Sequence, residues 1–201
     1  MNIARLAAQM LADLTLPHER WAQPVLIGLF GVPGAGKTAV ADHLASRHPL
    51  LILSTDALRL RYGLESGLLT RQVMDQLALQ LLPGQISIVF DGIHLGRRDR
   101  TAVHQLAQAA GATAQLVHVT AAPQVIEQRL QARMAAPDMV AAEGKFVITP
   151  EHFQRIVGYF EPPAPNEHVI GVDTTCKSLG NQLDRFDAQL TRYLHGAVAA
   201  E

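Results

Sequence analysis

The sequence predicts an α/β fold in which helices cover both faces of a parallel sheet, giving three layers. Two observations lead to this prediction. Five short apolar runs recur along the chain, and segments with helical patterns separate them. Apolar strands of this kind are typical of parallel sheets that are buried on both faces. With 201 residues, of which 48% are hydrophobic, the chain suits one such domain with a sizeable core.

The expected strands coincide with the apolar runs, at residues 25–30, 50–55, 86–91, 114–120 and 168–174. Helices are expected to follow Lys37, Thr70, Gly96 and Pro123. These helices are expected to end at proline and glycine residues, namely Pro49, Pro83 with Gly84, and Gly111. This alternation of strands and helices continues from the first strand to the last, as a single parallel sheet requires.

The first 22 residues predict an amphipathic helix that ends near Pro17. Apolar residues from Ile3 to Leu14 recur at helical spacing, with charged residues among them. The apolar stretch is too short to span a bilayer, and it lacks the order of a signal peptide. We therefore expect a cytoplasmic protein without membrane attachment. The helix is expected to be a packing element, with partner binding as the alternative.

Charge and cysteine content restrict the partners. The formal net charge is −1, so no global positive field exists to hold a long nucleic acid by its phosphates. A short nucleic-acid end stays open as a ligand, because a local basic site would suffice. Cys176 is the only cysteine, which excludes an intramolecular disulfide and fits a reducing compartment. We expect it to be a buried structural thiol.

The clearest motif follows the first expected strand. Residues 31–38, GVPGAGKT, match G-x-x-x-x-G-K-[ST] and lie between a strand and a helix, as phosphate binding requires. The glycines let successive N–H groups point into one anion-binding concavity. Lys37 adds a charge at the β- and γ-phosphates, and Thr38 offers its hydroxyl to Mg²⁺. The predicted nucleoside triphosphate site comprises Gly31, Val32, Pro33, Gly34, Ala35, Gly36, Lys37 and Thr38.

The second expected strand ends in Ser54-Thr55-Asp56. In a parallel sheet the carboxyl ends of the strands face the ligand crevice, so Asp56 can accept a proton from an acceptor hydroxyl there. Arg59, three residues later, could neutralise an anionic group of that acceptor. The alternative is structural: Asp56 would cap a helix beginning at Ala57.

The third expected strand ends in Asp91 after near-continuous apolar residues, which is the Walker-B pattern. Asp91 is expected either to hold Mg²⁺ through water or to position the acceptor. His94, just beyond, is a candidate substrate contact or a hydrogen-bonded structural group. The next expected helix then begins with three basic residues, Arg97, Arg98 and Arg100. The positive end of the helix dipole lies at this end of the helix and disfavours three cations there. Either they are solvated, or an anionic substrate lies near them.

Arg129 and Arg133 lie four residues apart and so share one helix face. On a mobile element such a pair could close over the triphosphate and stabilise charge that develops on the transferred group. The alternative is that both are exposed, with one of them paired to Glu127 or Asp138. No N-K-x-D motif follows the fourth expected strand, so ATP is expected rather than GTP.

These motifs, in this order over about residues 25–175, resemble a group of small P-loop kinases. The segments that carry the resemblance are GVPGAGKT, STDALR, IVFDGIHLGRRDR, QRLQAR and FEPPAPNEHVIGVDT. The group includes zeta toxins, polynucleotide 5′-hydroxyl kinases and chloramphenicol phosphotransferase. The resemblance implies a three-layer P-loop NTPase fold with strand order 2-3-1-4-5 and a helical lid around Arg129 and Arg133.

The resemblance also implies roles for single residues. Asp56 and Arg59 match the spacing of the base and the following arginine in polynucleotide-kinase-like members. Asp91 and Arg100 match the third-strand aspartate and its downstream arginine, whereas His94 stands where an asparagine is frequent. The expected domains are an N-terminal helix over 1–22, a P-loop kinase domain over 23–178 with a lid at about 129–150, and a C-terminal helix over 179–201 packed on the domain.

Two functions from different classes follow. The first is an ATP- and Mg²⁺-dependent kinase, a monomer or homodimer, that acts on a hydroxyl of a small molecule or a nucleic-acid end. The second is a nucleotide-binding ATPase or switch that acts on a protein partner. A kinase needs a base such as Asp56 beside an open acceptor pocket. Residues 61–84, where the acceptor would bind, carry no recognisable signature of its identity.

Overall fold

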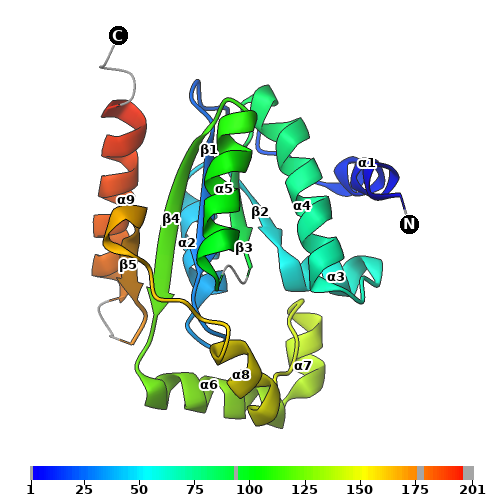
Figure 1. Cartoon of the computed structure of the whole chain (residues 1–201), viewed down its shortest axis with the longest axis vertical. Helices are drawn as coiled ribbons and strands as arrows, with labels where there is room; N and C mark the ends of the chain where they lie inside the picture. The colour runs from blue at the N-terminus through cyan, green and yellow to red at the C-terminus, as the bar shows by residue number, and fades with distance from the viewer. Residues whose placement is uncertain (1, 93–94, 176–178, 197–201) are drawn as a thin grey trace.

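A computed structural model describes residues 2–92, 95–175 and 179–196 of the chain. It confirms the predicted α/β architecture, with a five-stranded parallel sheet in the order β2-β3-β1-β4-β5 and helices on both faces (Figure 1). The strands are β1 Val25–Phe30, β2 Leu50–Ser54, β3 Ser87–Asp91, β4 Thr113–Thr120 and β5 Ile170–Asp173. None extends more than one residue beyond its expected range.

The α-helices of the described chain connect and flank these strands. They are α1 Ile3–Asp13, α2 Lys37–Arg47, α3 Thr55–Tyr62, α4 Gly67–Leu81, α5 Arg97–Ala109, α6 Pro123–Ala135, α7 Pro137–Ala142, α8 Pro150–Val157 and α9 Leu179–Gly196. Short 3₁₀ turns occupy Leu82–Gly84 and Pro165–Glu167. Helix α1 ends at Asp13, earlier than the predicted stop near Pro17, and Leu14 is already extended.

The two faces of the sheet belong to two separate cores. Successive side chains of a strand point to opposite faces, so Leu26 and Phe30 of β1 face one core while Ile27 and Leu29 face the other. The first core includes residues of α1, α4 and α5, and the second includes residues of α2 and α9. Both consist of buried apolar side chains, and they hold the sheet, and with it its carboxyl edge, in place.

Helix α1 packs on α4 through Ala7 and Met10, which are fully buried. The amphipathic pattern of the first residues therefore corresponds to a packing face, as expected. Within the described residues, no helix is both long enough and apolar enough to cross a membrane.

A helical segment crosses the carboxyl edge of the sheet. The chain leaves β4, forms α6, α7 and α8, and returns to β5, so that these helices lie below the strand ends in Figure 1. We call residues 123–169 the lid, residues 143–149 between α7 and α8 its tip, and residues 160–167 on the way to β5 its root.

Candidate active site

The loop between β1 and α2 has the conformation that phosphate binding requires. Gly36 precedes α2 with φ = 98°, in the left-handed region that favours glycine. At Gly31, where φ is 146°, a Cβ would lie 2.1 Å from the carbonyl oxygen of Val119 on the neighbouring strand. The loop thus needs glycine at both positions, and its backbone leads directly into the N-terminus of α2.

Lys37 lies inside this loop. Its Nζ donates hydrogen bonds to the carbonyl oxygens of Gly31, at 2.9 Å, and Val32, at 3.1 Å. Burial lowers the pKa of the ammonium, and the nearby carboxylates of Asp91 and Asp56 oppose that shift. The cation is therefore held at the place where the motif predicts the β- and γ-phosphates.

Thr38 and Asp91 lie side by side at the start of α2 and the end of β3. The Thr38 hydroxyl donates to Oδ2 of Asp91 at 2.8 Å, and Asp91 is only 6% exposed. A hydroxyl and a carboxylate are hard oxygen donors, which fit Mg²⁺. In the described part of the chain, no group of three or more His, Cys, Asp or Glu residues could hold a metal by itself. An Mg²⁺ ion here would share its coordination with phosphate oxygens and water, as is usual for this ion.

Asp56 is not the cap of the next helix. Helix α3 begins at Thr55, and the Ser54 side chain accepts the hydrogen bond from the backbone N–H of Ala57. The alternative in which Asp56 caps a helix starting at Ala57 is therefore wrong. Burial raises the pKa of Asp56, as does the Asp91 carboxylate to a lesser degree, while nearby cations oppose the shift. Asp56 instead lines the cavity that is described next.

A cavity of about 880 Å³ joins these residues at the carboxyl edge of the sheet. This volume is near the upper end of the range for small-molecule sites, which leaves room for a nucleotide and a second small group. The P-loop, α3 and the lid form its walls. Of the residues predicted from the sequence, it brings together Pro33, Gly34, Gly36, Lys37, Thr38, Asp56, Asp91, Arg129 and Arg133.

The two lid arginines have different surroundings. Arg129 donates through Nη1 to the carbonyl of Gly34 at 2.9 Å and to Oγ1 of Thr174 at 2.8 Å, and through Nη2 to the carbonyl of Thr174 at 3.0 Å. The Thr174 hydroxyl in turn donates to the carbonyl of Ala35 at 2.6 Å. Arg129 thus ties the lid and the end of β5 to the P-loop. Arg133 lines the cavity one turn further along α6 and favours the charged form of Asp56.

Reasoning from the sequence missed several polar residues of the cavity wall, among them Asp42, Arg61, Lys145 and Thr174. Asp42 could have been found, because it follows Thr38 by one helical turn and so shares its face. Lys145 of the lid tip has no such signal, since only the fold brings it near α2. Burial and Asp91 raise the pKa of Asp42, and Lys145 opposes this shift.

Arg59 does not line the cavity. Its Nε and Nη2 donate to the carbonyls of Leu64 and Glu65, at 3.2 and 3.0 Å, and its guanidinium lies over the ring of Phe146 with 4.6 Å between Cζ and the ring centroid. The prediction that Arg59 contacts the acceptor does not fit this geometry. The guanidinium instead connects the end of α3 to the lid tip.

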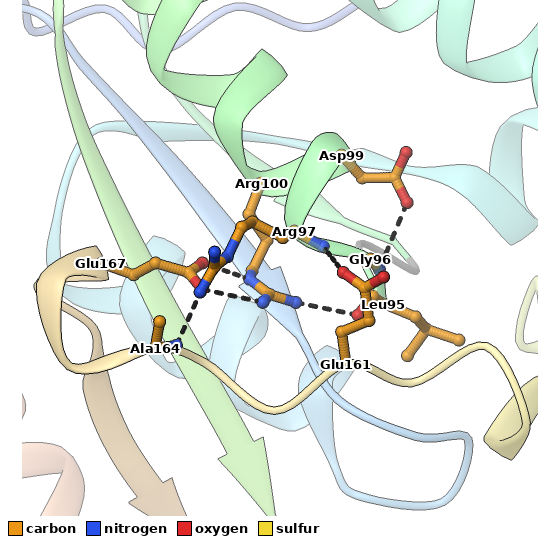
Figure 2. A network of polar contacts seen from close by, with 8 residues as sticks. All are labelled: Leu95, Gly96, Arg97, Asp99, Arg100, Glu161, Ala164 and Glu167. Carbon is orange, nitrogen blue, oxygen red and sulfur yellow. Dashed lines mark hydrogen bonds and ion pairs between the residues drawn. The ribbon is translucent and has the colours of Figure 1, made fainter.

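Arg100 also lies elsewhere. Its side chain is fully buried, and it binds both carboxylate oxygens of Glu167, with Nε to Oε2 at 2.6 Å and Nη2 to Oε1 at 3.0 Å (Figure 2). Its Nη1 donates to the carbonyl of Leu95 at 2.8 Å, and its guanidinium lies over Phe30. The predicted substrate contact of Arg100 is therefore corrected, because its anionic partner is a residue of the lid root. His94 and Cys176 lie outside the described residues.

The strand order, the loop between β1 and α2, and the aspartate at the end of β3 define a P-loop nucleotide-binding fold of the small-kinase type. The model of the AAA domain family matches residues 26–163, and the chain belongs to this family. No curated protein matches the sequence.

Solved structures share the fold over most of their length. A candidate kinase from Chloroflexus aurantiacus has a TM-score of 0.64 and 22% identity, covering 84% of this chain and 97% of its own. Kti12 from Chaetomium thermophilum, solved with ADP-AlF3, has a TM-score of 0.60 and 16% identity, with 80% and 96% covered. A gluconokinase from Sinorhizobium meliloti has a TM-score of 0.59 and 18% identity, with 90% and 98% covered. The resemblance to small P-loop kinases is thereby confirmed at the level of the fold.

Proposed function

We propose that the protein is a kinase that transfers the γ-phosphoryl group of ATP, with Mg²⁺, to a hydroxyl of a small molecule or of a nucleic-acid end. One observation carries this proposal: Asp56 shares a cavity with Lys37 and with the Thr38–Asp91 pair, and it is not used as a helix cap. A carboxylate next to a phosphate-binding loop can orient an acceptor hydroxyl and accept its proton during phosphoryl transfer. We further propose that the protein works in the cytoplasm as a monomer or homodimer.

The roles of the residues follow from their positions. The P-loop N–H groups and Lys37 hold the phosphates, and Thr38 with Asp91 would hold Mg²⁺, which neutralises charge on the phosphate oxygens. The acceptor oxygen forms a bond to the γ-phosphorus, and the bond from that phosphorus to the β,γ-bridging oxygen breaks, releasing ADP. Asp56 takes the proton of the acceptor hydroxyl. Its raised pKa makes it a better proton acceptor than an ordinary aspartate.

The two lid arginines then have separate functions. Arg133 faces the cavity and is placed to stabilise charge on the transferred group. Arg129 acts through the P-loop, which it holds by its bonds to Gly34 and Thr174. This connection also supports the second candidate function, an ATPase or switch, because it would couple the state of the nucleotide to the position of the lid.

One transfer assay separates the two functions. The protein is incubated with γ-labelled ATP, Mg²⁺ and a panel of nucleosides, 5′-hydroxyl oligonucleotides, sugars and cell-extract metabolites. The kinase proposal expects label in one acceptor, a loss of transfer in Asp56→Asn with nearly unchanged ATP affinity, and a loss of turnover in Lys37→Ala. Label found only in free phosphate would favour the ATPase. Transfer that is unchanged in Asp56→Asn would remove the base assignment.

A further inference from the structure

The lid tip docks on α3 directly beside Asp56. Gly144 lies near Ala57, and a Cβ on Gly144 would be in ordinary van der Waals contact with the Cβ of Ala57, at 3.5 Å. Two residues further along, the ring of Phe146 is covered by the guanidinium of Arg59. The tip also contributes Lys145 to the cavity wall. Two segments that are far apart in the sequence, α3 and the lid tip, thus touch each other at the wall of the cavity.

In this contact, the guanidinium of Arg59 is held by hydrogen bonds to residues close to it in the sequence. Its hydrogen bonds to Leu64 and Glu65 are local, within five or six residues of Arg59 itself. Both acceptors lie just after α3, and neither belongs to the lid. Phe146 belongs to a segment without regular secondary structure, between α7 and α8. In this pair the arginine is therefore the fixed half and the phenylalanine is the half that can leave.

We propose that Arg59 and Phe146 form a latch that holds the lid tip over Asp56, so that Arg59 is a positioning residue and not an acceptor ligand. The catalytic consequence rests on the proposed kinase function, whereas the contact itself does not. When the latch is closed, the tip restricts the access of water to the γ-phosphate beside Asp56. Lid closure of this kind serves to exclude water from phosphoryl transfer.

Hydrogen exchange tests the latch without any assumption about the reaction. The amides of residues 143–149 are followed in the full chain and in Phe146→Leu, Arg59→Gln and the double variant. Phe146→Leu keeps an apolar side chain but removes the aromatic face, and Arg59→Gln removes the charge. Each single variant is expected to speed exchange of the tip by about 2–5-fold, the weaker part of the range of a cation–π contact, because Arg59 and Phe146 are both partly exposed. The double variant is expected to equal either single one.

A neighbouring residue provides the matched control. Val147 follows Phe146 in the tip and is 37% exposed, so Val147→Ala is expected to leave tip exchange unchanged. Unchanged exchange in Phe146→Leu, or effects of the two single variants that add in the double variant, would overturn the latch. This result does not depend on whether the protein is a kinase.

Turnover without an added acceptor separates a latch from an acceptor ligand. Phosphate release from ATP–Mg²⁺ into water is measured for Phe146→Leu and Arg59→Gln, with Lys37→Ala as the blank. Both variants are expected to raise the rate of release by about the same 2–5-fold, because both open the same contact. A rate that stays constant or falls, or that changes in Arg59→Gln alone, would overturn the proposal. Wild-type release equal to the Lys37→Ala blank would instead count against the proposed function, and exchange would then decide the latch.

Discussion

Two of the places where the lid is attached to the body of the domain, its root and its tip, differ in kind. At the root, Arg100 and Glu167 form a bidentate ion pair. The arginine side chain is fully buried, and the glutamate side chain is 12% exposed. At the tip, the guanidinium of Arg59 lies over the ring of Phe146, with no hydrogen bond between the two side chains. Both arginines were expected to bind substrate, and both instead bind the lid.

The difference lies in what it costs to open each contact. Removing one partner of a buried ion pair leaves an uncompensated charge in a low-dielectric site, which costs about 3–5 kcal/mol. Arg59 and Phe146 are both partly exposed, so this cation–π contact lies toward the weak end of its range, at about 0.5–1 kcal/mol, and opens readily. The root can therefore act as a fixed hinge, and the tip as a contact that opens and closes. Figure 2 shows how the root is reinforced, since Glu161 also accepts a hydrogen bond from the backbone N–H of Arg97.

The strongest test of this comparison is Arg100→Ala. Glu167 would lose its bidentate partner and Leu95 a buried hydrogen-bond donor, so we expect a loss of about 3–5 kcal/mol in the free energy of unfolding. Urea denaturation measures this loss. Arg97→Ala is the matched control, because its side chain is 59% exposed and its contact with Glu167 spans 3.6 Å. An Arg100→Ala protein as stable as this control would break the comparison.

Glu167→Gln probes the same root through its pH dependence. The Arg100 guanidinium lowers the pKa of Glu167 from 4.5 to about 2. Because the folded-state pKa lies below the ordinary value, the charged carboxylate contributes stability above about pH 4.5, and this contribution is lost as the pH falls toward 2. We expect Glu167→Gln to cost about 3 kcal/mol at neutral pH. The stability difference from wild type should shrink between pH 4.5 and 2, and a constant difference would contradict the ion pair.

Arg129 and Arg133 allow a second comparison, between two arginines at the place where the lid meets the P-loop. Arg129→Ala removes three hydrogen bonds from a charged donor, so we expect a loss of about 1.5–3 kcal/mol in stability, and weaker ATP binding. Arg133 makes no hydrogen bond or ion pair among the described residues, so Arg133→Ala should leave stability nearly unchanged and lower kcat. Thermal unfolding measures the stability, calorimetric titration measures the ATP affinity, and the transfer assay measures kcat. Equal losses of ATP affinity in the two variants would refute this division.

The smallest expected effect is at the tip. Phe146→Leu should lower the free energy of unfolding by about 1 kcal/mol or less, because a partly exposed cation–π contact is weak and leucine keeps part of the packing. Urea denaturation beside Arg100→Ala measures the ratio of tip to root directly. A loss in Phe146→Leu as large as that in Arg100→Ala would mean that the tip is as firmly held as the root.

Much of the donor half of the site could be predicted from the sequence, because its signals are local. The P-loop is one contiguous segment, and Asp56 and Asp91 each follow an apolar strand whose carboxyl end must face the crevice. The helix-cap alternative for Asp56 stayed open because a serine and an aspartate two positions apart are both common caps. Only the first turn of α3 showed that Ser54 has this role.

The sequence by itself determined the sheet, the phosphate-binding loop and the aspartates at its edge, because strand periodicity and a contiguous loop depend on neighbours in the chain. The tertiary structure alone decided that Arg59 faces Phe146 and that Arg100 pairs with Glu167. A guanidinium beside a strand end looks the same in the sequence whether its partner is a phosphate or another side chain. The partner of Arg100 is a glutamate 67 residues later, and only the folded lid brings that charge into reach. Long, freely rotating arginine side chains bind whatever anion or aromatic ring the fold places near them.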